Sequence, residues 1–119
     1  MPRVRSYQDL VVWQKGMELG VSTYSLTTRL PSAEQFGLVA QMRRAAVSIP
    51  SNIAEGFGRQ ATGEYRHHLS VARGSVQELE TQLLICERLG YVAHENTAPL
   101  VDEAQQLSRM LATLVARFR

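Results

Sequence analysis

Cysteine, lysine and aromatic residues are scarce in this chain of 119 residues. Cys86 is the one cysteine, so no disulfide can form within the chain, and this usage is typical of the reducing cytoplasm. No run of about 18 apolar residues occurs, and the N-terminal MPRVRSYQ lacks the apolar segment of a signal peptide. We therefore expect a soluble cytoplasmic protein that does not use a membrane.

Side chains that hold metals or carry catalysis are few and badly spaced. His67 and His68 are adjacent, so on a helix they point about 100° apart and cannot chelate one ion together. His94 lies in a predicted loop, and Cys86 takes an apolar position where a small hydrophobic residue belongs. The sequence therefore predicts no metal, no cofactor and no catalytic residues, and we expect the protein not to be an enzyme.

Gly56, Gly58 and Ala61 fit the dinucleotide-binding pattern G-x-G-x-x-A by letter. That pattern binds pyrophosphate where a strand turns into the N-terminus of a helix, whereas here no strand is predicted and the glycines close a helix. Helix termination and close packing are the preferred interpretation.

Apolar residues recur at intervals of three and four, and no useful stretch alternates with period two. With 45% apolar and 20% charged residues, the composition is that of a globular protein. Four amphipathic helices with short connections predict an all-α, up-and-down four-helix bundle in a single domain over residues 1–119. The helices are expected at about residues 7–29, 33–60, 63–90 and 97–118.

The helix predicted over residues 33–60 contains Pro50, yet its apolar phase continues across the proline. A proline inside a helix removes one backbone hydrogen bond and clashes with the preceding turn, so we expect one helix that is kinked there. Ser32 and Gln35 form a capping box that should begin it. Its core face is predicted to hold Val39, Met42, Ala46, Ile49, Ile53 and Phe57.

A second stripe on the same helix is polar, and a third side is again small or apolar, so we expect burial on two sides. In a bundle interior the polar residues would fix helix register by hydrogen bonding, and we prefer this interpretation to an active site. Glu55 and Arg59, one turn apart with the acid first, should pair. This polar seam consists of Gln41, Arg44, Ser48, Asn52, Glu55 and Arg59.

Ser6 and Asp9 form a capping box that opens the first helix. The inward face of this helix is predicted to be Leu10, Trp13, Met17, Val21 and Tyr24. Three apolar residues spaced by seven lie on the opposite side, a repeat that is typical of a seam for another helix. The expected oligomer interface therefore consists of Val12, Leu19 and Leu26, together with Phe36 and Val47 from the back of the second helix.

The last two helices have single apolar faces. Thr62 is the predicted N-cap of the third helix, Gly90 its end, and Asn96 or Thr97 the N-cap of the fourth. The third helix should bury Leu69, Ala72, Val76, Leu79, Leu83 and Cys86. The fourth should bury Leu100, Ala104, Leu107, Leu111, Leu114 and Phe118.

Positive charge is concentrated in the first part of the chain. Residues 1–73 hold nine Lys or Arg against five Asp or Glu, although the net charge is only +2. Twelve of the thirteen basic residues are arginine, which suits bidentate contact with phosphate, and the pI is near 9.0. The candidate nucleic-acid-binding residues are Arg43, Arg44, Arg66, Arg73 and Lys15, and the alternative is a solvated face. Arg43 is preferred to Arg44 for phosphate, because Arg44 lies in the polar seam.

A long pattern resembles one protein family. Its parts are DLVVWQ at residues 9–14, then Leu30-Pro31, Glu34, Phe36-Gly37-Leu38, Gln41, Arg43-Arg44-Ala45-Ala46, Ser48-Ile49, Asn52-Ile53-Ala54-Glu55-Gly56, Gly58-Arg59, Gly74-Ser75, Glu78-Leu79 and Gly90-Tyr91. Over about residues 7–92 the chain is similar to proteins encoded in 23S rRNA intervening sequences, a family that includes the accessory variability determinant of diversity-generating retroelements.

The resemblance implies a four-helix bundle that assembles into a ring-like homopentamer with a basic surface. It also implies binding to structured RNA or DNA and, for the accessory proteins, a reverse transcriptase as partner. We therefore expect a non-enzymatic, oligomeric accessory protein that binds structured RNA. The alternative is a protein-interaction scaffold whose basic charge is incidental.

Overall fold

The computed structural model describes residues 4–118, and within them every regular element is helical. Two short 3-10 helices precede the long ones: η1 before α1 and η2 before α2. The elements are η1 (Tyr7–Asp9), α1 (Val11–Thr27), η2 (Ser32–Glu34), α2 (Leu38–Phe57), α3 (Thr62–Arg88) and α4 (His94–Arg117). The predicted all-α four-helix bundle is confirmed.

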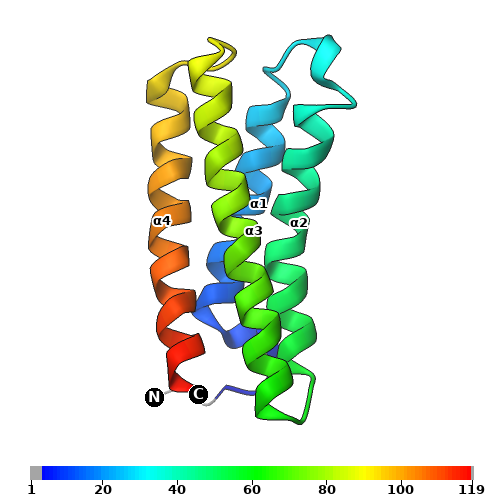
Figure 1. The fold of residues 1–119 in the computed structure, drawn as a ribbon, viewed down its shortest axis with the longest axis vertical. Coiled ribbons are helices and arrows are strands. Elements are labelled where there is room, and N and C mark those ends of the chain that lie inside the picture. The colour runs from blue at the N-terminus through cyan, green and yellow to red at the C-terminus, as the bar shows by residue number, and fades with distance from the viewer. Residues whose placement is uncertain (1–3, 119) are drawn as a thin grey trace.

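The four long helices run side by side and alternate in direction (Figure 1). The α1–α2 and α3–α4 connections lie at one end of the bundle, and the α2–α3 connection lies at the other (Figure 1). Each helix packs against its neighbour in sequence, and α1 also packs against α4. None of the helices over residues 4–118 combines the length and the apolarity needed to cross a membrane.

The core is built mainly by α2, α3 and α4 on the faces that their apolar spacing predicts. All six predicted core residues of α3 are fully buried, from Leu69 to Cys86. In α4, Leu100, Ala104, Leu107 and Leu111 are buried. Leu114 and Phe118, near the end of the chain, pack against this core and remain partly exposed.

The prediction for the first helix is wrong in part: Leu10 and Trp13 pack against the core as predicted, but the other residues of the predicted inward face do not. Val12, Leu19 and Leu26 are buried in the core of the chain, whereas Met17, Val21 and Tyr24 are exposed. The buried stripe also contains Gly16 and Thr23. A Cβ added at Gly16 would lie 3.2 Å from Ile49 Cγ2, so a small residue is needed where α1 approaches α2. The core face of α1 therefore looks less apolar in sequence than the face turned outward.

Helix α2 runs without a break from Leu38 through Pro50 to Phe57, as the continuous apolar phase predicts. The expected kink stays a prediction. Its beginning differs from expectation, because Ser32 and Gln35 form no capping box and the residues from Ser32 to Glu34 form η2 instead. Glu34 Oε1 accepts a hydrogen bond from the Leu38 amide at 3.2 Å, so an acidic side chain caps the first turn.

The predicted caps elsewhere have mixed outcomes. The capping box of Ser6 and Asp9 is present, but it opens η1 instead of α1. Thr62 is the first residue of α3 and Ala61 its N-cap, while α4 begins at His94, before Asn96 and Thr97.

The end of α3 is as predicted. Gly90 has a φ of 77°, and the Gly90 amide donates to the Glu87 carbonyl at 3.0 Å. The Tyr91 amide donates to the Cys86 carbonyl at 3.0 Å, which completes a Schellman motif.

Candidate functional site

The polar seam of α2 meets α3 in a hydrogen-bonded cluster. The Ser48 and Ser75 hydroxyls lie 2.9 Å apart, and Asn52 Nδ2 donates to the Ser48 carbonyl at 2.9 Å. Asn52 Oδ1 lies 3.1 Å from His68 Nδ1. Because the amide nitrogen of Asn52 is already a donor to Ser48, its oxygen is the acceptor and His68 Nδ1 carries the proton.

This cluster is a structural contact between two helices. His68 bonds to an amide oxygen, so it is positioned neither by a carboxylate nor against a hydroxyl nucleophile. The other members of the seam lie outside it: Glu55 pairs at 3.0 Å with Arg59, which lies just beyond the end of α2, and Gln41 and Arg44 are exposed. Within residues 4–118, no group of three or more His, Cys, Asp or Glu is placed to hold a metal ion.

Three of the five candidate nucleic-acid-binding residues are engaged inside the chain. Arg43 Nε donates to Thr27 Oγ1 at 2.9 Å, and its guanidinium lies 4.6 Å from the centre of the Tyr24 ring, so it ties α2 to α1. Arg66 bonds the carbonyl of Phe118, and Arg73 bonds the hydroxyl of Ser108, so both tie α3 to the C-terminal helix.

The two remaining candidates lie on other boundaries of the bundle. Arg44 lies between α2 and α3, 4.0 Å from Glu78, with 71% of its side chain exposed. Lys15 lies between α1 and α4 beside Glu18 and Glu103. The five residues therefore do not form one patch. Of the two adjacent arginines, Arg44 has the more exposed side chain, whereas Arg43, which we preferred for phosphate, is hydrogen-bonded within the chain.

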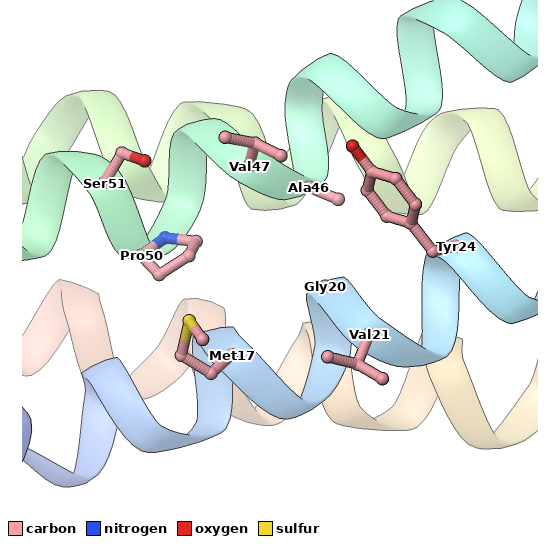
Figure 2. Close-up of a pocket in the computed structure, with 8 residues that line it drawn as sticks. All are labelled: Met17, Gly20, Val21, Tyr24, Ala46, Val47, Pro50 and Ser51. Atoms are coloured by element: carbon pink, nitrogen blue, oxygen red, sulfur yellow. The ribbon is translucent and has the colours of Figure 1, made fainter.

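An apolar groove lies on the outer surface between α1 and α2, with a volume of about 440 Å³ (Figure 2). Met17 from α1 and Pro50 from α2 extend into the space between the two helices, and Tyr24 closes one end (Figure 2). Val21 is 68% exposed, and Val47, across the groove, is 50% exposed. The groove is lined by Met17, Gly20, Val21, Tyr24, Ala46, Val47, Pro50 and Ser51.

The five residues predicted for an oligomer interface differ in their exposure. Of the five predicted interface residues, Phe36 and Val47 are exposed, whereas Val12, Leu19 and Leu26 lie inside the chain's own core. The expectation that the latter three form an exposed seam is therefore wrong. The small residue Gly20 lies beside α2 in this groove, where an added Cβ would lie 3.6 Å from the Ala46 carbonyl oxygen.

Comparison with known proteins places this bundle in a family. A crystal structure of a protein of unknown function from the S23 ribosomal protein family of Bacteroides thetaiotaomicron VPI-5482 matches the chain with a TM-score of 0.80 and 22% identity. The match covers 88% of this chain and 98% of that one, and it shows a shared fold. No curated protein matches the chain. The sequence profile described as 23S rRNA-intervening sequence protein matches residues 8–113, so the chain belongs to the 23S rRNA-intervening sequence protein family.

Proposed function

We propose that this protein is a non-enzymatic, self-assembling helical bundle that binds structured RNA as an accessory protein in the cytoplasm. The observation that carries the proposal is the apolar groove between α1 and α2, where Val21 and Val47 are at least half exposed. Contiguous exposed apolar side chains of this kind mark interaction surfaces. Assembly is therefore the activity that the geometry supports best.

Assembly also supplies a physical route to RNA binding. One chain carries a formal charge of only +2, and its arginines are spread over several helix boundaries. Several copies held together present their charges to the same polyanion, so weak contacts on each copy act jointly. Arginine as nearly the whole basic content and membership of a family named for 23S rRNA intervening sequences favour RNA as the polyanion.

One observation favours a second candidate, a protein-interaction scaffold with incidental charge. Arg43, Arg66 and Arg73 all donate hydrogen bonds within the chain, so each of them stabilises a contact between helices. A scaffold would assemble through the same groove but would not bind RNA.

The two candidates are separated by binding of the full-length protein to a structured RNA between about 50 and about 200 mM salt. If RNA is the partner, affinity falls steeply with salt, because phosphate binding releases counterions. Arg44→Gln should weaken binding and reduce the salt slope, since Arg44 is the freest of the candidate arginines.

The matched control is Gln41→Ala, one turn earlier on α2, at an exposed residue whose replacement leaves the charge unchanged. It should bind RNA as the unmodified protein does. Absence of binding at the lowest salt would refute the RNA part of the proposal and leave the scaffold.

A further inference from the structure

A hollow of about 240 Å³ lies between α3 and α4, two helices that lie side by side (Figure 1). Its volume is below the range of about 300–1,000 Å³ that is typical of pockets for drug-sized ligands, so a ligand in it would be small. The side chains from α3 are polar, and those from α4 are apolar. The hollow is lined by Ser70, Arg73, Gly74 and Gln77 from α3 and by Ala112 and Val115 from α4.

Arg73 brings a positive charge to this hollow with no carboxylate to neutralise it. The residue is half-buried, and it takes part in none of the ion pairs that the structure shows between residues 4 and 118. None of the residues that line the hollow is acidic. A charge that is partly withdrawn from water usually has a partner of opposite sign. An anionic ligand would supply that partner.

The guanidinium of Arg73 is held in place while most of its donors stay available. Its Nε donates to Ser108 Oγ at 3.3 Å, which leaves the two amino groups, Nη1 and Nη2, for a ligand. Ser70 lies three residues before Arg73 on α3 and Gln77 four residues after it, so the three side chains lie on the same side of the helix. A donor group that is already held in place loses little freedom when a ligand binds.

Gly74 lines the hollow and leaves it open. The residue lies in the interior of α3, where glycine destabilises a helix relative to alanine. An added Cβ would have nothing within 4 Å, and the φ of Gly74 is not in the left-handed region, so neither packing nor backbone conformation within the chain requires a glycine. The effect of the missing side chain is to leave space beside Arg73.

These donors suit a phosphate group. A guanidinium matches the oxygens of either a phosphate or a carboxylate. A phosphate monoester carries about −1.5 to −2 charges at pH 7 and has three acceptor oxygens, so it can accept hydrogen bonds from Arg73, Ser70 and Gln77 together. A carboxylate has only two oxygens. Val115, on the opposite side of the hollow, offers an apolar contact for the organic part of such an ester.

We propose that the hollow between α3 and α4 binds a small phosphate monoester, with its phosphate on Arg73, Ser70 and Gln77 and its organic part against Val115. This site is separate from the α1–α2 groove and does not depend on self-assembly. The same chemistry occurs in a free phosphate ester and at the 5′-phosphorylated end of an RNA, and the test distinguishes these two sources.

The test is calorimetric titration of the full-length protein with phenyl phosphate, which should show saturable binding. Arg73→Gln should weaken this binding by about tenfold or more, because a charged hydrogen-bond donor is lost. Arg73 also links α3 to α4, so a second variant leaves it intact. Gly74→Leu should abolish binding by filling the hollow, while helical circular dichroism is maintained because leucine favours a helix more than glycine does.

The matched control is Arg88→Gln, which removes the same charge from an exposed residue of α3 that lies 15 residues after Arg73, about 22 Å along the helix. It should bind phenyl phosphate as the unmodified protein does. Two further ligands test the chemistry: benzoate, a carboxylate, and methyl phenyl phosphate, a diester with one negative charge. Both should bind at least about tenfold more weakly than phenyl phosphate.

Three results overturn the proposal: no saturable binding of phenyl phosphate, binding that Gly74→Leu leaves unchanged, or binding of benzoate or the diester as tight as that of phenyl phosphate. Competition with a short RNA then identifies the source. Displacement of phenyl phosphate by the 5′-phosphorylated RNA alone assigns the site to an RNA end, and displacement by neither RNA form assigns it to a free ester. Equal displacement by the 5′-phosphorylated and 5′-hydroxyl forms would show that backbone diesters occupy the hollow, and would refute the monoester site.

Discussion

At the scale of single residues, Gly56 marks a close approach between α2 and α3. A Cβ added there would lie 2.5 Å from His68 Cβ and 3.2 Å from Tyr65 Cδ1. We expect Gly56→Ala to lower the free energy of unfolding by about 1–3 kcal/mol, because the half-buried His68 and Tyr65 must move to make room. Urea unfolding followed by circular dichroism measures the change.

Gly74 offers the matched control, since it also lies within a helix but has nothing within 4 Å of an added Cβ. Gly74→Ala should raise stability by about 0.5–1 kcal/mol, because alanine restricts the unfolded chain and favours the helix. Equal effects of the two substitutions would show that the contact at Gly56 is unimportant.

Glu87 should make stability depend on pH. Its carboxylate accepts hydrogen bonds from the Thr97 hydroxyl and, at 2.9 Å, from His94, and these bonds lower the pKa of Glu87 below its ordinary 4.5. Because the folded pKa is the lower one, the stabilisation is complete above the unfolded pKa and is lost as pH falls through the folded value.

Urea midpoints of Glu87→Gln and the unmodified protein between about pH 3 and pH 7 test this expectation. The unmodified protein should be more stable above pH 4.5, and the difference should shrink below it. Asp102→Asn, at an exposed residue of α4, should not reproduce that trend. A difference that stays constant across the range would contradict the assignment.

The role of a single residue could be predicted from the sequence only where the residues it interacts with are close to it in the chain. Gly90 ends α3 as predicted because glycine, which has no Cβ, adopts the left-handed conformation without steric cost. The start of α2 could not be predicted, since Glu34 caps it while also accepting a hydrogen bond from Tyr91, which lies in the α3–α4 connection at the same end of the bundle. This bond favours the neutral phenol and is the main reason that the pKa of Tyr91 is raised.

At the scale of elements, apolar spacing was sufficient for α3 and misleading for α1. The core face of α3 carries apolar residues at every predicted position from Leu69 to Cys86, four of them Leu or Val, so its orientation follows from the spacing. The core face of α1 contains Gly16 and Thr23, while the outer face contains Met17 and Val21. Which face of α1 is buried depends on how closely α1 approaches α2, and the spacing of apolar residues does not determine that distance.

The polar cluster between α2 and α3 predicts a second stability effect. Asn52→Ala removes the donor to Ser48 and leaves the proton on His68 Nδ1 without its acceptor. We expect a loss of about 1–3 kcal/mol in the free energy of unfolding, since a half-buried polar group loses its partner. Thermal or urea unfolding measures it.

Ser51→Ala, at the exposed neighbouring residue, is the control and should change stability by less than about 0.5 kcal/mol. If Asn52→Ala were as mild as this control, the cluster would not hold the two helices in register.

At the scale of the whole molecule, the bundle could be predicted from four amphipathic segments, but the candidate surface could not. The charge counts suggested one basic region, yet Arg43 faces α1, Arg73 faces α4 and Arg44 lies toward α3. Which boundary an arginine reaches depends on the rotation of each helix about its axis. Because the rotation predicted for the first helix was wrong, Met17, Val21 and Tyr24 were expected in the core and not in the groove.

The proposed function requires this chain to work as an assembly formed through its exposed apolar surface, the α1–α2 groove. Light scattering of the full-length protein, diluted stepwise to micromolar concentration, tests it most directly. The unmodified protein should have a mass that is a defined multiple of one chain, and Val21→Glu should have the mass of a single chain. A mass of one chain for the unmodified protein at every concentration would contradict it.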